Sequence, residues 1–490
     1  MRHLLAALPV SVCFGRPNRA EVCVLVGVVL LLAGGTGIGW LAWSARSAAA
    51  VPDLTASDGT LEVSSDPSGA SLRVDDQPRG IAPTEVVLVP GTHTVTLQAA
   101  DAIPETRQIE VTAAGSQLDL TLWRSHPIVQ YLRSALPGAA LINARFLADG
   151  RLGLVLRLPG EEFQAWTLDP NAHLVAERLG AIATHAPLAI RPDGQTVAML
   201  QPRADTPASS SSPVLSDHVA MGEVWLIPTG ANGAAQHMWL ATDPAEDLVD
   251  LEWAPDQTHL LVVGRQPVSG GAARTAIHWL DVASGAEQDL ALLPSEVAPD
   301  TYVWSPDGHT VAFVVHTASL AAVCTLSVSG EFRYLGDLNH DGLLGPPVAP
   351  MAWAPDDRVL YGALVSQTPT ATSSSPFSQN PAGLFLADPA GAPGHPFGTT
   401  PSIAPLWLAA GRLLAVGMPG GQETGLYLRE LDAQGNARDL ASIDVPAPGP
   451  TAYGVRWDVA HQRALVITNR DSSSGPAHDY WLVDFGWGTS

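Results

Sequence analysis

The stretch Trp304-Ser305-Pro306-Asp307-Gly308 decides the fold of this chain, because close copies of it recur along the sequence. Pro306 presets the backbone angle φ for the second position of a type I turn, and Ser305 is a favoured first residue. Gly308 accepts the positive φ that follows the turn. Short apolar runs flank the stretch on both sides and have the composition of β-strands. The stretch therefore predicts a tight β-hairpin.

Copies of this hairpin recur at a spacing of about 45–60 residues, which is typical of a β-propeller with four strands per unit. The near-copies are Ile190–Gly194, Trp253-Ala254-Pro255-Asp256-Gln257 and Trp353-Ala354-Pro355-Asp356-Asp357, and the weaker ones are Phe146–Gly150, Trp407–Gly411 and Trp457–His461. Counting first strands predicts seven blades, beginning near residues 141, 186, 249, 300, 350, 403 and 453. The last two blades lack the Pro-Asp pair, so six and eight blades stay open.

The last blade ends at Tyr480–Phe485, which is a third strand with almost nothing after it. A propeller must close its ring to hide the edges of its sheets. The run Ile128–Arg133 lies before the first blade and has no partner of its own. We therefore expect it to supply the fourth strand of the last blade.

These repeats resemble the TolB-type β-propellers, and the resemblance covers about residues 125–490. In that family the motif is structural, because the Trp packs between blades and the Pro-Asp-Gly makes the turn. The resemblance implies the same roles for the matching residues, which are Trp253, Pro255, Asp256, Trp304, Pro306, Asp307, Gly308, Trp353, Pro355 and Asp356.

The N-terminal segment has the pattern of a membrane anchor. Residues 1–20 form a basic head, and within residues 21–43 the run Val22–Trp43 has no charge. Its length matches the roughly 20 residues of a helix that crosses a bilayer. Three arginines precede the run and one follows it, so the positive-inside rule places the N-terminus in the cytoplasm and the rest outside. The alternative is a leader cleaved near residue 50, with secretion of the remainder.

After a polar linker at residues 44–58, residues 59–123 alternate apolar and polar side chains with a period of two. This pattern predicts a small antiparallel β-sandwich. The segment resembles the PEGA domain at Ser65–Ala70, at Gly80 and at Pro90–Val95, and departs from it at Asp76, where a glycine is usual. The resemblance implies an extracytoplasmic spacer or envelope-contact module without catalysis.

Composition limits the range of partners. The net charge is −23, and the chain contains no lysine. Residues 51–490 carry 21 arginines against 47 acidic residues, a balance of −26. Such a domain repels phosphate backbones, which excludes nucleic acid as an expected partner. The three cysteines cannot form a disulfide framework, and Cys324, in an apolar strand, is predicted to be a core residue.

One short motif has the pattern of a metal site. Asp337, Asn339 and Asp341 place oxygen ligands at positions 1, 3 and 5 of a loop with Gly342 at position 6, as in the opening of a calcium loop. No carboxylate follows at positions 9 and 12, so a turn without metal is the open alternative. We interpret the acids within residues 243–247 as solvated loop charges, and His93 and His278 as ordinary strand residues.

The sequence contains no nucleophile elbow, zinc-protease motif, phosphate loop or dinucleotide fingerprint, so no catalytic or cofactor-binding residue is assigned. We predict a membrane-anchored extracytoplasmic binding or scaffold protein at the cell envelope, with a protein or an envelope glycan as its partner. No cofactor other than calcium is expected. The alternative is a propeller hydrolase or lactonase, or a carbohydrate binder. Carboxylates and histidines converging at the centre of the ring would favour the enzyme.

Overall fold

The computed structural model describes the chain from residue 58 onward, with gaps, and the described residues belong to the second of two compact units, Met1–Thr55 and Ala56–Ser490. The described ranges are 58–132, 140–157, 163–171, 175–180, 187–203, 220–229, 234–268, 273–297, 301–316, 321–337, 351–364, 382–389, 394–397, 402–408, 412–417, 426–445, 453–470 and 477–487. Within these ranges the fold is all-β, and no helix has the length and apolarity needed to cross a bilayer. The helix predicted at residues 21–43 lies outside them.

Residues 59–121 form two sheets around one core. Their order is β4-β1-β7 and β3-β2-β5-β6. The strands are β1 (Gly59–Asp66), β2 (Ser71–Val74), β3 (Gln77–Ile81), β4 (Thr84–Leu88), β5 (Gly91–Gln98), β6 (Glu105–Val111) and β7 (Ser116–Thr121). The expectation of a purely antiparallel sandwich was wrong for one pair, because β1 runs parallel to β7, with Leu61 opposite Ser116. The reason is that β7 leaves the sheet of β6 and joins β1 in the other sheet, so the two are not linked by a hairpin.

After residue 127, the described residues form seven sheets, six of them built from strands in chain order. The first three sheets contain β9 (Ala140–Phe146), β10 (Leu152–Arg157), β11 (Phe163–Asp169), β12 (Val175–Gly180); β13 (Leu188–Ile190), β14 (Thr196–Pro202), β15 (Met221–Pro228), β16 (Gln236–Leu240); and β17 (Asp247–Trp253), β18 (His259–Gln266), β19 (Arg274–Asp281), β20 (Glu287–Leu293).

The remaining four sheets contain β21 (Glu296–Val297), β22 (Val303–Trp304), β23 (Thr310–His316), β24 (Ala321–Ser327), β25 (Phe332–Asp337); β26 (Met351–Trp353), β27 (Val359–Leu364), β28 (Ala382–Ala387), β29 (His395–Phe397); β30 (Ser402–Trp407), β31 (Leu413–Gly417), β32 (Leu426–Leu431), β33 (Ala437–Ile443); and β34 (Tyr453–Asp458), β35 (Arg463–Arg470), β36 (Ala477–Asp484) with β8 (Ile128–Tyr131). In the fourth sheet, β21 and β22 both pair with β23 in place of a single first strand.

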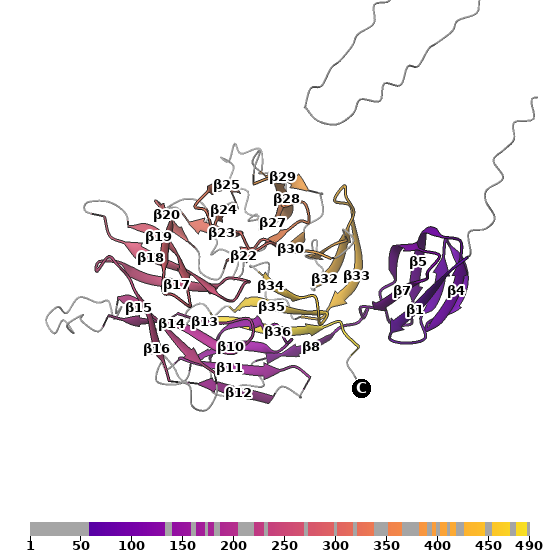
Figure 1. The fold of residues 1–490 in the computed structure, drawn as a ribbon, viewed down its shortest axis with the longest axis horizontal. Coiled ribbons are helices and arrows are strands. Elements are labelled where there is room, and N and C mark those ends of the chain that lie inside the picture. The colour runs from indigo at the N-terminus through magenta and orange to yellow at the C-terminus, as the bar shows by residue number, and fades with distance from the viewer. Residues whose placement is uncertain are drawn as a thin grey trace, which may run out of the picture. The chain divides into compact units, whose positions relative to one another are not determined.

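The ring closes by the strand exchange that the sequence predicted. Strand β8 pairs antiparallel with β36, with Tyr131 opposite Trp481, and so becomes the fourth strand of the seventh sheet. The ring of Tyr131 stacks on Trp481 at 4.6 Å, and its hydroxyl donates to Asp479 at 2.7 Å. In Figure 1 the first strands β13, β17, β22, β30 and β34 lie toward the middle of the ring, and fourth strands such as β12, β16 and β20 lie at its outside.

The middle of the second strand of each sheet is apolar because both of its faces are covered. In β18, Leu260 and Val262 pack in a core cluster shared with the second sheet, whereas Leu261 and Val263 pack in a cluster shared with the fourth. Since successive side chains of a strand point to opposite faces, such a strand needs apolar residues at every position. Similar clusters lie between each pair of neighbouring sheets, including the seventh and the first.

The β-sandwich and the sixth and seventh sheets share side-chain contacts. Ile103 is buried in the cluster between those two sheets, and Trp487 packs against the sandwich core. Trp487 Nε1 donates to the carbonyl of Leu122 at 2.7 Å. Arg412 bridges Glu105 of β6 and Glu430 of β32, with its Nε 2.6 Å from the Glu430 carboxylate. The sandwich is therefore packed against the sheets that follow it.

Candidate functional site

The repeat motif forms the turn between the first and second strands of every sheet whose turn is described, which leaves out the sixth sheet, where residues 409–411 are not described. The amide of Gly308 donates to the carbonyl of Ser305 at 2.9 Å, and the amide of Gln257 donates to Ala254 at 3.0 Å. The residue after the Asp has positive φ in each copy, 70° at Gly308, 61° at Gln257 and 64° at Asp357. The last two are not glycine, so these copies accept a conformation that costs a non-glycine residue about 1 kcal/mol.

The Asp of each turn caps the backbone that follows it. Asp307 accepts from the hydroxyl of Ser305 at 2.6 Å and from the amide of His309 at 3.0 Å, and these bonds hold the pKa of its carboxyl below the usual value. Burial raises the pKa of Asp256, but hydrogen bonds from Thr258 and His259 outweigh this effect and lower it. These carboxylates are ionised turn residues, and they fit a structural role better than that of proton donors.

The motif tryptophans join neighbouring sheets. Trp253 is 2% exposed, and its Nε1 donates to the carbonyl of Ala189 in the preceding sheet at 3.1 Å. Trp353 makes the same bond to Val303 at 2.9 Å. Trp304 Nε1 is buried, but no acceptor faces it among the described residues. The same motif position therefore carries an inter-sheet hydrogen bond in some sheets and packing alone in another.

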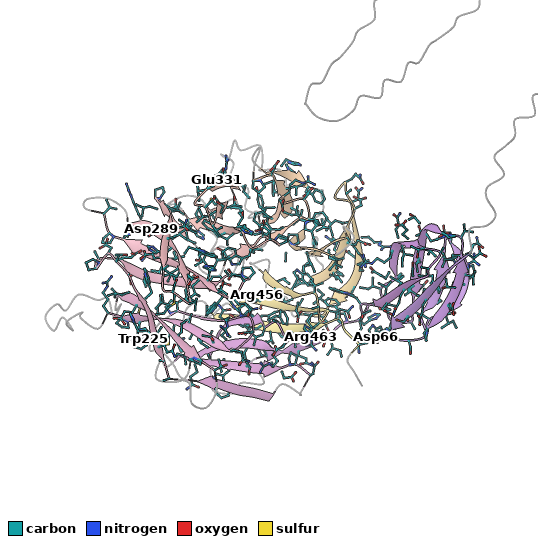
Figure 2. The ribbon with its side chains drawn as sticks, viewed as in Figure 1. Asp66, Trp225, Asp289, Glu331, Arg456 and Arg463 are labelled. Carbon is teal, nitrogen blue, oxygen red and sulfur yellow. The ribbon has the colours of Figure 1, made fainter. Side chains whose placement is uncertain are left out.

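At the middle of the ring, polar side chains of the first strands pair with one another. Arg145 of β9 donates two hydrogen bonds of 2.7 Å to the carboxylate of Glu252 on β17, linking the first sheet to the third. The hydroxyl of Tyr302 donates to Asp250 at 2.9 Å, linking the fourth sheet to the third. Figure 2 places Arg456 of β34 toward the same central region. Polar and charged side chains therefore pair with one another near the middle of the ring.

The predicted calcium loop falls almost entirely outside the described residues. Strand β25 ends at Asp337, and residues 338–350, which include Asn339 and Asp341, are not described. The calcium site therefore stays a prediction. Cys324 is buried at 1% exposure, as predicted.

A β-bulge recurs between the third and fourth strands of five sheets among the described residues, and the sequence did not reveal it. In each case the register shifts by one residue, as between Ile277–Ala291 and His278–Asp289. The third-strand residue that follows the shift varies among the sheets, and these residues are Trp166, Trp225, His278, Cys324 and Arg429. Bulges re-aim side chains and are frequent beside functional sites.

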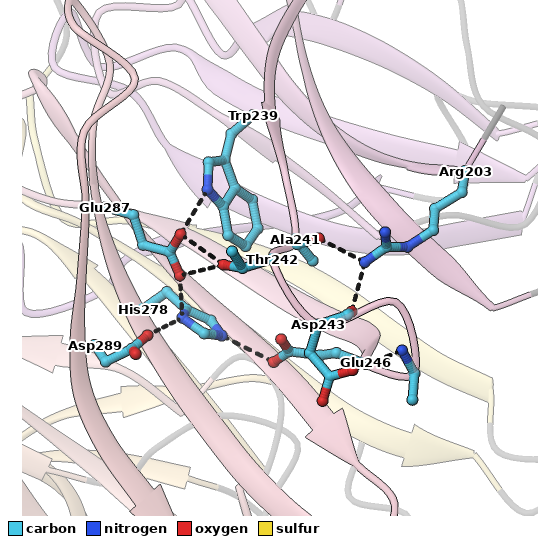
Figure 3. Close-up of polar contacts among 10 residues, drawn as sticks. Arg203, Trp239, Ala241, Thr242, Asp243, Glu246, His278, Glu287 and Asp289 are labelled. Atoms are coloured by element: carbon cyan, nitrogen blue, oxygen red, sulfur yellow. Dashed lines mark hydrogen bonds and ion pairs between the residues drawn. The ribbon is translucent and has the colours of Figure 1, made fainter. Parts of the chain in front are cut away.

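In the third sheet this position holds a buried histidine among three carboxylates (Figure 3). Nε2 of His278 lies 2.8 Å from Glu246, and Nδ1 lies 2.7 Å from Asp289 and 3.1 Å from Glu287. Burial lowers the pKa of His278, but the hydrogen bonds and charges of Glu246 and Asp289 outweigh it and raise the pKa. The ligand atoms of His278, Glu287 and Asp289 all lie within 4.8 Å of one another, which brings them together as candidate metal ligands.

Two interpretations from sequence are corrected here. Glu246 was read as a solvated loop charge, yet its side chain is 1% exposed, because the loop between β16 and β17 turns it inward onto His278 and Gly264. His278 was read as an ordinary strand residue, yet both of its ring nitrogens face carboxylates. Glu287 and Asp289 lie on the strand that follows His278, but Glu246 comes from a loop 32 residues earlier, so no local pattern reveals the whole cluster. The sequence did offer one local signal for the cluster: a histidine and two acidic residues, His278, Glu287 and Asp289, lie on consecutive strands of one hairpin.

A family model described as the PEGA domain matches residues 58–124. No curated protein matches the chain. Among solved structures, the chain is similar to an oligogalacturonate lyase from Vibrio parahaemolyticus, with 13% identity, a TM-score of 0.45, and coverage of 73% of this chain and 93% of the lyase. It is also similar to the β-propeller domain of the Trilobed protease from Pyrococcus furiosus, with 12% identity, a TM-score of 0.38, and coverage of 70% and 95%.

TolB from Acinetobacter baumannii is a further similar structure, with 13% identity, a TM-score of 0.27, and coverage of 66% of this chain and 77% of TolB. These values carry no argument about activity. The architecture rests on the strand pairing and ring closure of the chain itself. Residues 58–124 carry a PEGA domain, and the sheets that follow form a β-propeller.

Proposed function

We propose that the chain is a membrane-anchored extracytoplasmic binding protein, in which residues 125–490 form a seven-bladed propeller that docks a protein partner. Residues 21–43 provide the single-pass anchor, and residues 59–123 are the spacer that carries the propeller. The proposal assigns no catalytic residue and requires no cofactor. Calcium bound in the loop that begins at Asp337 would be a further feature of the protein, and the docking function does not require it.

The pairing of polar groups at the middle of the ring carries this proposal. Arg145 engages both carboxylate oxygens of Glu252, and each side chain is less than a fifth exposed, at 18% and 14%. A general acid or base needs a carboxyl oxygen that faces a substrate, whereas here the guanidinium of Arg145 engages both carboxylate oxygens of Glu252. This arrangement favours recognition by the outer surfaces of the ring over chemistry at its centre.

Contacts of the spacer support a role in presenting the propeller. Ile103 packs in the cluster between the sixth and seventh sheets, and Arg412 pairs with Glu105 and Glu430. A domain joined to the propeller by a flexible linker alone would lack such contacts. The balance of −26 over residues 51–490 further indicates a partner with a basic surface, whose association rate would fall as salt screens the attraction.

Cross-linking of the full-length protein in native membranes, followed by isolation and mass spectrometry, tests the proposal. We expect one stoichiometric protein partner with a basic surface, recovered in lower yield when the cross-linking is done at high salt. Glycan retained without a protein would contradict the docking function and favour wall binding or glycan hydrolysis, and Glu252→Gln would then be the first variant. Recovery of the chain from the medium rather than the membrane fraction would contradict the anchor. Calorimetric titration with calcium, compared between the wild type and Asp337→Asn, tests the loop separately.

A further inference from the structure

We propose that Nδ1 of His278 and the carboxylates of Glu287 and Asp289 bind a divalent transition-metal ion such as zinc, with Glu246 orienting the imidazole from its other side. The three ligands lie on the hairpin of β19 and β20, and Glu246 comes from the loop before β17 (Figure 3). This site is independent of the docking function, and neither proposal depends on the other.

The donors and acceptors around His278 leave one position at which a cation could bind. A neutral imidazole has one N–H group, and its other nitrogen is an acceptor. If Nε2 donates to Glu246 at 2.8 Å, Nδ1 presents a lone pair to the oxygens of Asp289 at 2.7 Å and Glu287 at 3.1 Å. Three electron-rich atoms then converge on one point. A proton there bridges Nδ1 to one oxygen at a time, whereas a metal ion binds all three.

Measured from Nδ1, the distances to the two carboxylates require only small movements. A tetrahedral site with bonds of about 2.0–2.1 Å places its ligand atoms about 3.3 Å apart. The present separations from Nδ1, 2.7 and 3.1 Å, would therefore lengthen by a few tenths of an ångström. Asp289 is 78% exposed and Glu287 is 21% exposed, so both carboxylates have room to move, while the buried imidazole stays fixed.

Glu287 and His278, the two less exposed ligands, are each oriented by hydrogen bonds from or to other residues. Oε2 of Glu287 accepts from Nε1 of Trp239 at 3.0 Å and from the hydroxyl of Thr242 at 3.1 Å. Oε1 lies 3.1 Å from Nδ1 of His278 and also accepts from the Thr242 hydroxyl at 3.4 Å. The carboxylate of Glu246, 2.8 Å from Nε2, orients the imidazole. A carboxylate behind a ligating histidine and hydrogen bonds to a ligating carboxylate are the usual outer partners of metal sites.

The backbone is shaped to admit Glu246. A Cβ at Gly264 of β18 would lie 1.9 Å from the Glu246 carboxylate oxygen, so any larger residue displaces that carboxylate. The loop that carries Glu246 is held by Arg203, which donates to the carbonyls of Ala241 at 2.6 Å and Asp243 at 2.5 Å. Glycine at 264 and arginine at 203 therefore serve the position of one buried carboxylate.

The donor set selects the class of metal. One imidazole nitrogen and two carboxylates suit zinc and its neighbours, whereas calcium and magnesium favour all-oxygen shells with more ligands. A dication neutralises the charges of Glu287 and Asp289. Three protein ligands leave a fourth position for water or a small anion, as in zinc sites that remain open.

Cobalt(II) is the probe for this site, because its visible absorption reports the coordination that zinc would adopt. The full-length chain is stripped with EDTA, dialysed and titrated with cobalt chloride, and the bound cobalt is then displaced with zinc chloride. We expect one cobalt ion per chain with nitrogen and oxygen ligands and no thiolate charge-transfer band. Asp289→Asn, at a largely exposed position, is expected to keep the fold and to weaken cobalt binding about tenfold or more.

Two further variants separate ligation from packing. Gly264→Ala displaces Glu246 without touching a ligand, and is expected to weaken binding about 10–100-fold. Asp439→Asn changes the aspartate opposite Arg429, which has the same position relative to the bulge in the sixth sheet, and should leave binding unchanged. The proposal is overturned if the wild type shows no cobalt spectrum, if Glu287→Gln and Asp289→Asn both bind like wild type, or if Asp439→Asn loses binding equally. Circular dichroism verifies the fold of each variant.

Discussion

Replacing motif tryptophans with phenylalanine should destabilise the propeller unequally, because their indole N–H groups differ in hydrogen bonding. Trp253 donates to Ala189 at 3.1 Å, whereas Nε1 of Trp304 is buried without an acceptor among the described residues. Both replacements lose a similar part of an aromatic ring, so most of the packing loss cancels between them. The difference between their losses in the free energy of unfolding therefore measures the contribution of the indole N–H group.

The magnitude follows from these contacts. Trp253→Phe loses a hydrogen bond with a net value of about 0.5–1.5 kcal/mol. Trp304→Phe removes a buried unpaired donor, whose desolvation costs about 1–3 kcal/mol, and so recovers part of what its lost packing costs. Trp253 is also the more deeply buried of the two, which acts in the same direction. We expect the free energy of unfolding to fall by at least about 1.5 kcal/mol more for Trp253→Phe than for Trp304→Phe.

Equilibrium unfolding in urea, followed by far-ultraviolet circular dichroism, measures this difference for the full chain. The comparison is valid only if the denaturant dependence m is equal in both variants. Trp353→Phe is the matched control, because Trp353 Nε1 donates to Val303 at 2.9 Å and should behave like Trp253. Equal losses at Trp253 and Trp304, or a larger loss at Trp304, would refute the reasoning.

Two other predictions concern ring closure and pH. Tyr131→Ala removes the stack on Trp481 and should speed hydrogen exchange of the β36 amides by about tenfold or more, whereas Tyr131→Phe, which keeps the stack, should change it less. Unchanged exchange in the alanine variant would contradict the role of β8. The hydrogen bond to Asp75 raises the pKa of His93, so its stabilisation is complete below the usual histidine pKa and is lost as pH rises through the raised value. His93→Gln should therefore flatten the pH dependence of PEGA-domain stability between mildly acidic and alkaline conditions, and a wild-type stability that rises with pH there would count against it.

The propeller could be predicted from sequence because its determinants are local. The Pro306-Asp307-Gly308 turn, the apolar second strands and the spacing of the motif all lie within short stretches, and strand β8 follows from the need to close the ring. The parallel pairing of β1 with β7 was missed because it depends on a crossover between two sheets, which leaves no trace in the alternation of either strand.

The histidine cluster could not be predicted, because its geometry depends on contacts between distant segments. Glu246 reaches His278 only because Gly264 leaves space beneath its carboxylate and Arg203 holds the loop. Each of these residues has an ordinary local interpretation, as a loop acid, a strand glycine or a loop arginine. Their joint role appears only when three strands and one loop are brought together.

The position after the recurring bulge explains why a specialised cluster can arise in a single sheet. Motif positions such as Trp253 and Asp256 are constrained, because they join sheets and cap turns, so a change there costs stability. The bulge position makes neither the motif turn nor the tryptophan hydrogen bond between sheets, and it holds tryptophan in two sheets, cysteine in the fourth and arginine in the sixth. In the sixth sheet Arg429 pairs with Asp439 opposite, and in the third His278 faces Asp289 in the same register. A repeat fold thus keeps its framework constant and varies one shielded position, and in the third sheet that position holds an imidazole, whose nitrogens can bind a metal.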